Sequence, residues 1–233
     1  MSQPEVTTFS WDGIRLVVFD VDGTLYRQLP LRLRMARDML VRAARSANWT
    51  HIRVLKSYRT IREELGDAET ADFEPILIQR TAAATGASPD YVSACVTEWM
   101  EDRPLAYVES CRYPGLLELF SGLRAHERSI GILSDYPVQA KLDRLRLSAD
   151  YLVSAVDPEV GMLKPNPRGL QHVIATAGVT PSQTVLIGDR TDRDGMAARR
   201  AGAHVLIRSS QPQEGWITFK RFDEPLFAPV LKA

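Results

Sequence analysis

The sequence has few cysteines and no long apolar run, and both features narrow the class of protein. Cys95 and Cys111 are its two cysteines in 233 residues, too few for the disulfide framework of a small secreted protein. No stretch approaches the roughly 18 consecutive apolar residues that a membrane helix needs. The first residues show neither the basic start nor the apolar run of a signal peptide. We therefore expect a cytoplasmic protein with reduced thiols and no membrane partner.

The chain also lacks net charge, because 29 Lys and Arg residues balance 29 Asp and Glu residues. This balance gives no overall attraction to nucleic acid, and we expect no nucleic-acid partner. There is no internal repeat and no low-complexity segment. A chain of 233 residues is long enough for one sizeable core and a smaller inserted unit, but its sequence does not indicate an oligomeric state.

Short apolar runs alternate with helical patterns near both ends of the chain. The first run, residues 14–20, is rich in Val and Phe and ends in an aspartate. Strands that alternate with helices predict an α/β fold with a doubly wound parallel sheet. The fold of the tail after Ser209 stays open. The other expected strands are 130–133, 151–153, 184–187 and 204–207, and the expected helices are 116–126, 137–147, 167–177 and 195–201.

Residues 29–109 have a different character and predict an inserted helical domain. Ala, Arg, Leu and Glu dominate there, and apolar residues recur at helical spacing. Glycines and prolines divide the segment into about four helices. We therefore expect residues 1–28 and 110–233 to form the α/β domain around this insert.

The helical insert separates its charges along the chain. Residues 27–62 carry ten Lys and Arg side chains and one acid, whereas residues 63–110 carry eleven acids and two arginines. Charge runs of this kind usually mark solvated faces, and the two halves can pack with complementary surfaces. The alternative hypothesis is that arginines such as Arg32 and Arg34 point into a cleft and bind a second anionic group of a substrate.

Polar residues follow several expected strands, at the edge where parallel sheets bind ligands. Carboxylates gathered there repel one another unless a hard cation neutralises them, and an all-oxygen ligand set suits Mg²⁺. A lysine and a hydroxyl can hold an anionic phosphate ester, one carboxylate can attack phosphorus, and another can protonate the leaving group. The residues concerned are Asp20, Asp22, Ser134, Lys164, Asp189, Asp192 and Asp194.

The order and spacing of these residues resemble the motifs of the haloacid dehalogenase-like (HAD) hydrolase superfamily. The resemblance is carried by Asp20-Val21-Asp22-Gly23-Thr24-Leu25, by Ser134, by Lys164 before Pro165, and by Gly188-Asp189 followed by Asp194. It covers the chain outside the helical insert and the tail. It implies a Rossmann-type core, and the insert resembles the α-helical C1 cap of that family, which closes over the site and selects the substrate.

The resemblance also implies a role for each matching residue. Asp20 would be the nucleophile and a Mg²⁺ ligand, and Asp22 would act as general acid and then base while binding Mg²⁺ through its backbone carbonyl. Asp192 is an extra carboxylate, which we interpret as a first-turn helix acid or cap. Of the others, Ser134 and Lys164 would hold the phosphoryl group, Lys164 would offset the charge of Asp20, Asp189 would bind Mg²⁺, Asp194 would orient the ion or a bound water, and Thr24 would support the phosphate loop.

Asp22 separates two reactions within the resemblance. The dehalogenases lack an aspartate at this position, because a halide needs no proton on leaving whereas an alkoxide does. The resemblance therefore implies a phosphatase that hydrolyses a small phosphorylated metabolite through an aspartyl-phosphate intermediate, with Mg²⁺ as cofactor. Two alternatives stay open, a phosphomutase of the β-phosphoglucomutase kind and a non-catalytic regulatory protein on the same fold. The sequence does not name the phosphate ester.

Several aromatic and thiol side chains invite a functional role that we do not assign. Trp49, His51 and Tyr58 fit a stacking site for a substrate, but packing in the core or in the helical insert is the better explanation for each of them. Cys95 has no matched histidine, so the sequence does not indicate a thiol enzyme.

Overall fold

The structure is a computed structural model, and it describes residues 9–231. Within these residues, six strands form one parallel sheet in the order β3-β2-β1-β4-β5-β6. The order places β1 inside the sheet and confirms the doubly wound α/β fold. The strands are β1 (Leu16–Phe19), β2 (Ser129–Ser134), β3 (Tyr151–Ser154), β4 (Thr184–Gly188), β5 (His204–Arg208) and β6 (Thr218–Phe219).

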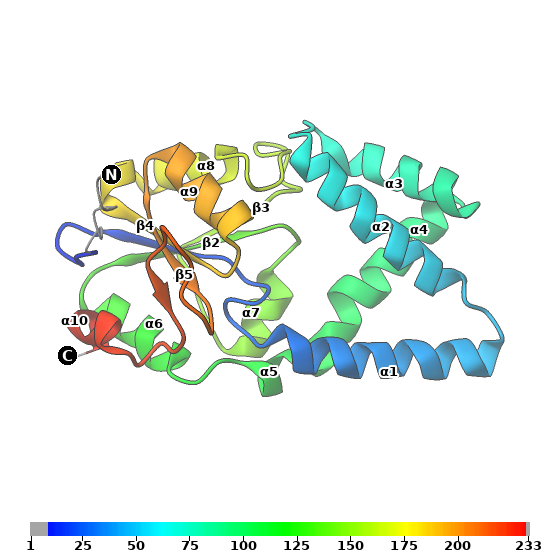
Figure 1. Cartoon of the computed structure of the whole chain (residues 1–233), viewed down its shortest axis with the longest axis horizontal. Coiled ribbons are helices and arrows are strands. Elements are labelled where there is room, and N and C mark those ends of the chain that lie inside the picture. Colours follow the sequence, from blue (N-terminus) through cyan, green and yellow to red (C-terminus); the bar gives the residue numbers. More distant parts are fainter. Residues whose placement is uncertain (1–8, 232–233) are drawn as a thin grey trace.

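The helices lie in two places, against the sheet and beyond one edge of it (Figure 1). Those of the first kind come mainly from the second half of the chain, and α1 to α4 are the second kind. The helices are α1 (Gln28–Ser46), α2 (Thr50–Asp67), α3 (Phe73–Thr85), α4 (Pro89–Val96), α5 (Val108–Cys111), α6 (Leu116–Ala125), α7 (Gln139–Leu145), α8 (Arg168–Ala177), α9 (Met196–Ala201) and α10 (Ala228–Leu231).

Helices bury both faces of the sheet. Side chains alternate along β1, so Val17 and Phe19 join one apolar layer while Leu16 and Val18 join the other. The layer on Leu16 is completed by α8 and α9, and the layer on Val17 by α6 and α10 (Figure 1). Burial on both faces explains why β1 reads as a continuous apolar run.

The tail after Ser209 adds to the sheet and to the core. Its short strand β6 pairs with β5, and α10 packs on α6. The indole N–H of Trp11 donates to the carbonyl of Leu226 at 2.6 Å, and the ring of Trp11 packs on Phe227. The tail therefore closes the core against the start of the described chain.

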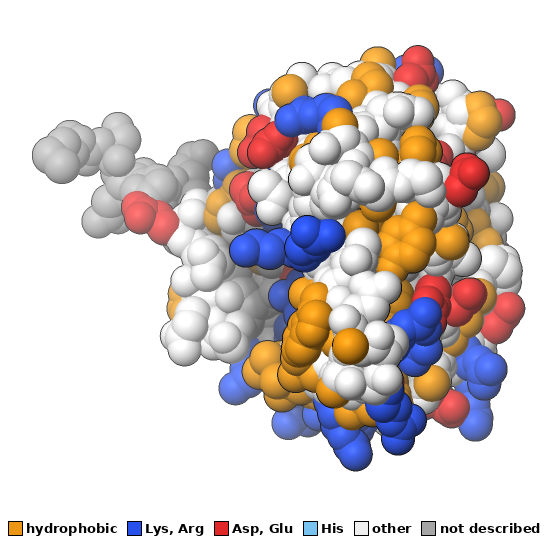
Figure 2. Space-filling model, turned by 90° about the vertical axis from the view of Figure 1, so that its right-hand side faces the viewer, with side chains coloured by type: hydrophobic (Ala, Val, Ile, Leu, Met, Phe, Trp, Pro, Cys, Tyr) orange, Lys and Arg blue, Asp and Glu red, His pale blue; other side chains and the backbone are white. Residues whose placement is uncertain are grey.

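The segment between β1 and β2 is helical, and its helices α1 to α4 extend from the carboxyl edge of the sheet (Figure 1). Ser88 caps α4 by accepting from the backbone N–H of Tyr91 at 3.2 Å, and Gly86 ends α3 in the left-handed conformation. Figure 2 looks at this end of the molecule and shows Lys and Arg side chains gathered along its lower edge, at the height of α1.

Two details differ from the sequence prediction. The helix expected over 137–147 begins at Gln139, because Val138 has a non-helical backbone. His51 and Tyr58 are buried, as packing residues should be, but Trp49 is 53% exposed at the junction of α1 and α2, so its interpretation as a packing residue is wrong. Among the described residues, no helix is both long enough and apolar enough to cross a membrane.

Candidate active site

A cavity of about 470 Å³ lies between the carboxyl ends of the central strands and the helices α1 and α2. Thr24 lies behind its wall, fully buried, and donates its hydroxyl to Asp20 Oδ2 at 2.9 Å. Asp192 is outside the cavity, with an exposed side chain that pairs with Arg190. The other residues expected in a site line the cavity, namely Asp20, Asp22, Ser134, Lys164, Asp189 and Asp194.

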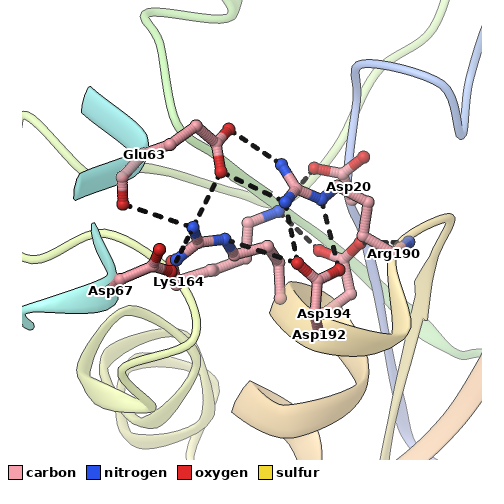
Figure 3. A network of polar contacts seen from close by, with 8 residues as sticks. Asp20, Glu63, Asp67, Lys164, Arg190, Asp192 and Asp194 are labelled. Atoms are coloured by element: carbon pink, nitrogen blue, oxygen red, sulfur yellow. Dashed lines mark hydrogen bonds and ion pairs between the residues drawn. The ribbon is translucent and has the colours of Figure 1, made fainter. Parts of the chain in front are cut away.

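Three carboxylates meet at one point of this cavity. Carboxylate oxygens of Asp20, Asp189 and Asp194 lie within 4.8 Å of one another. The ammonium group of Lys164 bridges two of them, at 2.5 Å from Asp20 Oδ1 and 2.6 Å from Asp194 Oδ1 (Figure 3). The residues come from loops after β1, β3 and β4, and the parallel sheet brings them to one edge.

The electrostatics of this cluster favour a bound cation. Burial raises the pKa of Asp20 well above its usual value, and Lys164 only partly offsets this. Burial and the neighbouring Asp194 raise the pKa of Asp189 to about 6. The raised pKa values of Asp20 and Asp189 mean that the single ammonium group of Lys164 does not neutralise the three carboxylates. Oxygens within 4.8 Å of one another are near the roughly 4.2 Å that separates opposite ligands of Mg²⁺, so the residues fit a divalent cation.

Two glycines allow the carboxylates to come this close. Gly23 has a φ of +101°, and a Cβ there would lie 2.0 Å from Asp189 Oδ2. A Cβ on Gly188 would lie 2.4 Å from the side chain of Asp194. A side chain at either position would displace a carboxylate, which explains why each motif contains a glycine.

The Asp22 carboxylate has its own partners. Lys141 donates to both of its oxygens, at 2.9 and 3.3 Å, and the Tyr26 hydroxyl donates to one of them. Burial pushes the pKa of Asp22 upward, but Lys141 and Tyr26 outweigh burial, and the net pKa is lowered. Sequence reasoning missed Lys141. Its signal was a lysine four residues before Leu145 and next to Leu142, on the buried face of α7.

The end of β2 and the turn after it contain Ser134 and Asp135, and the sequence did not reveal that Arg62 contacts this turn. Ser134 is buried, and its Oγ accepts from the backbone N–H of Tyr136 at 3.2 Å. Asp135 Oδ1 is buried without a hydrogen-bond partner among the described residues. Arg62 of α2 reaches this turn and donates to the carbonyl of Asp135 at 2.5 Å.

A set of ion pairs lies on one side of the cavity, with exposed Glu63, Asp67 and Arg190 and a buried Arg193. Arg190 donates to both oxygens of Glu63, at 2.9 and 3.1 Å (Figure 3). Arg193 bridges Glu63 and Asp67. These contacts join α2 to the loop after β4. Acids of the helical insert therefore pair here with arginines from outside it.

Other charged residues of the helical insert make different kinds of contact. Arg42 with Glu98 is an ion pair between its basic and acidic halves, at 2.6 Å. Arg32 lines the cavity. Arg34 instead contacts Ser110 and packs over the ring of Tyr107, away from the residues that line the cavity.

Comparison with known proteins gives consistent matches. The model of the family described as haloacid dehalogenase-like hydrolase matches residues 14–202. A glyceraldehyde 3-phosphate phosphatase from Methanopyrus kandleri is 30% identical over 208 residues, which cover 86% of this chain and 87% of that protein. A phosphoglycolate phosphatase from Pseudomonas fluorescens is 25% identical over 199 residues, which cover 82% of this chain and 68% of that protein.

Solved structures share the fold. A HAD hydrolase from Bacillus subtilis, solved bound to magnesium, has a TM-score of 0.63 at 14% identity, with 89% of this chain and 95% of that chain covered. A 2-haloacid dehalogenase from Pseudomonas syringae has a TM-score of 0.62 at 19% identity, with 90% and 95% covered. At these identities the likeness concerns the fold alone.

Proposed function

Because this chain belongs to the haloacid dehalogenase-like hydrolase family, we propose that it is a Mg²⁺-dependent phosphatase acting on a small phosphate monoester. One arrangement carries the proposal. The buried Asp20 carboxylate lies 2.5 Å from Lys164, and a second acid, Asp22, lines the same cavity two residues further on. The names of the two phosphatase relatives agree with this reaction.

Asp20 is the proposed nucleophile. Lys164 and Thr24 each hold one of its two oxygens, so the orientation of the carboxylate is fixed. Attack on phosphorus would give an aspartyl phosphate, which water then hydrolyses. Lys164 and Ser134 would hold the oxygens of the phosphoryl group as its charge shifts.

The proposed cofactor is Mg²⁺, held by Asp20, Asp189, Asp194 and the backbone carbonyl of Asp22. When bound, the ion would offset the charge of these carboxylates and of the phosphoryl oxygens. Asp194 also accepts from the backbone N–H groups of Asp189 and Arg190, at 3.2 and 3.0 Å, and these contacts fix its position.

Asp22 is the proposed acid and base. Its lowered pKa and its contact with Lys141 describe the ionised form, which can take a proton from water when the aspartyl phosphate is hydrolysed. In the first step the protonated form would give a proton to the leaving alkoxide. The same carboxyl group would therefore carry a proton in both steps.

The remaining parts of the proposal concern organisation. Residues 29–109 would be a cap over the α/β core of residues 1–28 and 110–233, since α1 and α2 contribute walls of the cavity. A cytoplasmic location would suit Cys95 and Cys111, which are both buried free thiols.

Phosphate release tests the proposal directly. Purified protein should release phosphate from small phosphate monoesters with Mg²⁺ and should stop when the metal is chelated. Steady product without a bisphosphate activator would separate this activity from a phosphomutase. No turnover on a broad panel of esters would contradict the proposal and favour a non-catalytic protein.

A further inference from the structure

Arg62 is a buried cation on the wall of the cavity. Its exposed fraction is 6%, and Tyr58 and Leu65 on the same face of α2 are buried with it. The helical spacing therefore places a guanidinium where an apolar side chain is expected. Among residues 9–231, no carboxylate oxygen lies within the 4.0 Å ion-pair distance of this guanidinium.

The contacts of Arg62 fix its position and supply no full negative charge. It donates to the Asp135 carbonyl at 2.5 Å and more weakly to the Tyr58 hydroxyl at 3.5 Å. Its plane packs over the ring of Tyr136, 4.0 Å from the ring centroid, and near that of Phe73, at 5.2 Å. A guanidinium has five N–H donors, so these two hydrogen bonds leave donors for a ligand.

The other arginines that line the cavity differ from Arg62. Arg190 and Arg193 are paired with Glu63. Arg32 and Arg59 are exposed, so water solvates their charge. Within the described chain, Arg62 is the arginine of this cavity that is both removed from water and without a carboxylate at ion-pair distance. The Asp135 carboxylate, beyond that distance, still favours the charged form of Arg62. A ligand anion in direct contact would add the hydrogen-bonded carboxylate partner that Arg62 lacks.

The cavity has room for more than a phosphate group beside Arg62. Its walls include Met35, Met39 and Met100, against which a short carbon skeleton can pack. Under the proposed function the phosphoryl group already has Ser134, Lys164 and the metal ion as partners. A further anion on the organic part of the substrate would then meet Arg62.

We propose that Arg62 binds a carboxylate on the organic part of the phosphate monoester, so that the substrate class is small phosphorylated carboxylic acids. This inference rests on the proposed phosphatase function. Arginine suits the task because its planar N–H groups match the two oxygens of a carboxylate. Arg62 is then a specificity-determining residue of the cavity.

The test compares two esters with the same three-carbon skeleton, 3-phosphoglycerate and glycerol 3-phosphate. Wild-type protein with Mg²⁺ should have the higher kcat/KM for 3-phosphoglycerate. Arg62→Met should lower that value about 10–100-fold, mainly through KM, because a charged hydrogen-bonded contact is lost. It should change glycerol 3-phosphate and p-nitrophenyl phosphate less than about threefold. Arg62→Lys should keep part of the preference, since it keeps the charge without the planar fork.

Arg53→Met is the matched control, an exposed arginine on the same helix, and it should leave the preference unchanged. An equal loss on all three esters would overturn the inference, because Arg62 would then hold the phosphoryl group or only the turn after β2. A wild-type enzyme without preference for the carboxylate would overturn it too.

Binding measured without turnover separates this inference from the phosphatase proposal. Calorimetry on Asp20→Asn protein with Mg²⁺ should show tighter binding of 3-phosphoglycerate than of glycerol 3-phosphate, and Arg62→Met should abolish the difference. Turnover without this difference would retain the phosphatase and reject the role of Arg62. If the binding difference were present but wild-type protein showed no turnover, the phosphatase proposal would be rejected and the role of Arg62 retained.

Discussion

Two groups of charged residues lie side by side in Figure 3, and they differ in burial rather than in distance. In the inner group, Lys164 and Asp20 are 2.5 Å apart and less than 10% exposed. In the outer group, Arg190 and Glu63 are 2.9 Å apart and about half exposed. Water screens the outer pair, whereas the inner charges depend on one another. Pairs at similar distances should therefore differ in how much they contribute to stability and activity. The predictions below concern this difference between buried and exposed charges.

The largest effect is expected from Asp20→Asn in the inner group. The amide has nearly the shape of the carboxylate but is a poor nucleophile, so turnover should fall by at least about 10⁴-fold. Phosphate release measures this, and circular dichroism should show an intact fold. Activity within tenfold of wild type would exclude Asp20 as the nucleophile.

Lys164→Met should lower the free energy of unfolding by about 3–5 kcal/mol in the absence of Mg²⁺, because it leaves buried carboxylates without their cation. Urea denaturation at pH 7 measures this. Added Mg²⁺ should restore part of the loss. Lys220→Met, at an exposed position, is the control and should change stability little. If the Lys164 variant were as stable as that control, the buried carboxylates would not depend on the Lys164 charge for stability.

Cys95 shows what burial does to a thiol whose pKa the nearby Arg42 lowers less than burial raises it. Burial raises the pKa of its thiol to about 11. At pH 8 alkylation of Cys95 in the folded protein should therefore be slower than that of a free thiol by on the order of 100-fold. The rate should rise as pH increases toward 11, and unfolding in urea should remove the protection. Rapid labelling at pH 8 in the native state would contradict this account.

Lys141→Met extends the comparison to Asp22. Loss of the Lys141 contact at 2.9 Å frees the Asp22 carboxylate to move, and kcat should fall about tenfold, a part of the usual contribution of a general acid or base. Alkyl phosphates should suffer more than p-nitrophenyl phosphate, whose leaving group needs little protonation. An equal loss on both would mean that Lys141 does not act through Asp22.

The smallest effect is expected in the outer group. Glu63→Gln removes a half-exposed charge that Arg190 and Arg193 share. Arg193 is itself buried, but it keeps Asp67 as a partner at 2.6 Å, so stability should change by less than about 1 kcal/mol. The difference should vanish near 1 M salt. Thermal melting at low and high salt measures both statements. A loss as large as that of Lys164→Met would remove the distinction between the two groups.

Local sequence patterns predict the fold and the site residues that directly follow strands. Asp20 and Asp189 come directly after apolar runs, so strand periodicity alone places them at one edge of a parallel sheet. The chemistry of Lys141 and Arg62 depends instead on which helix face meets the sheet, and this is a matter of tertiary packing. Each carries one weak local sign, a charged residue at an apolar helical position.

The tail shows another limit of sequence reasoning. Strand β6 has two residues, too few for a periodic pattern, and it forms because β5 offers an unpaired edge. Its Phe219 is buried by contacts with Phe222 and Phe227, which follow within the same tail. Neither the pairing nor this aromatic cluster can be read from a short window of sequence.

The missing side chain at Gly23 has a consequence for how variants are interpreted. The carboxylate of Asp189 occupies space that any Cβ at position 23 would fill. A single methyl group there would push a proposed metal ligand out of place without touching a reacting atom. An inactive Gly23 variant would therefore report crowding rather than lost chemistry, and a screen that equates inactivity with catalytic function would misclassify this position.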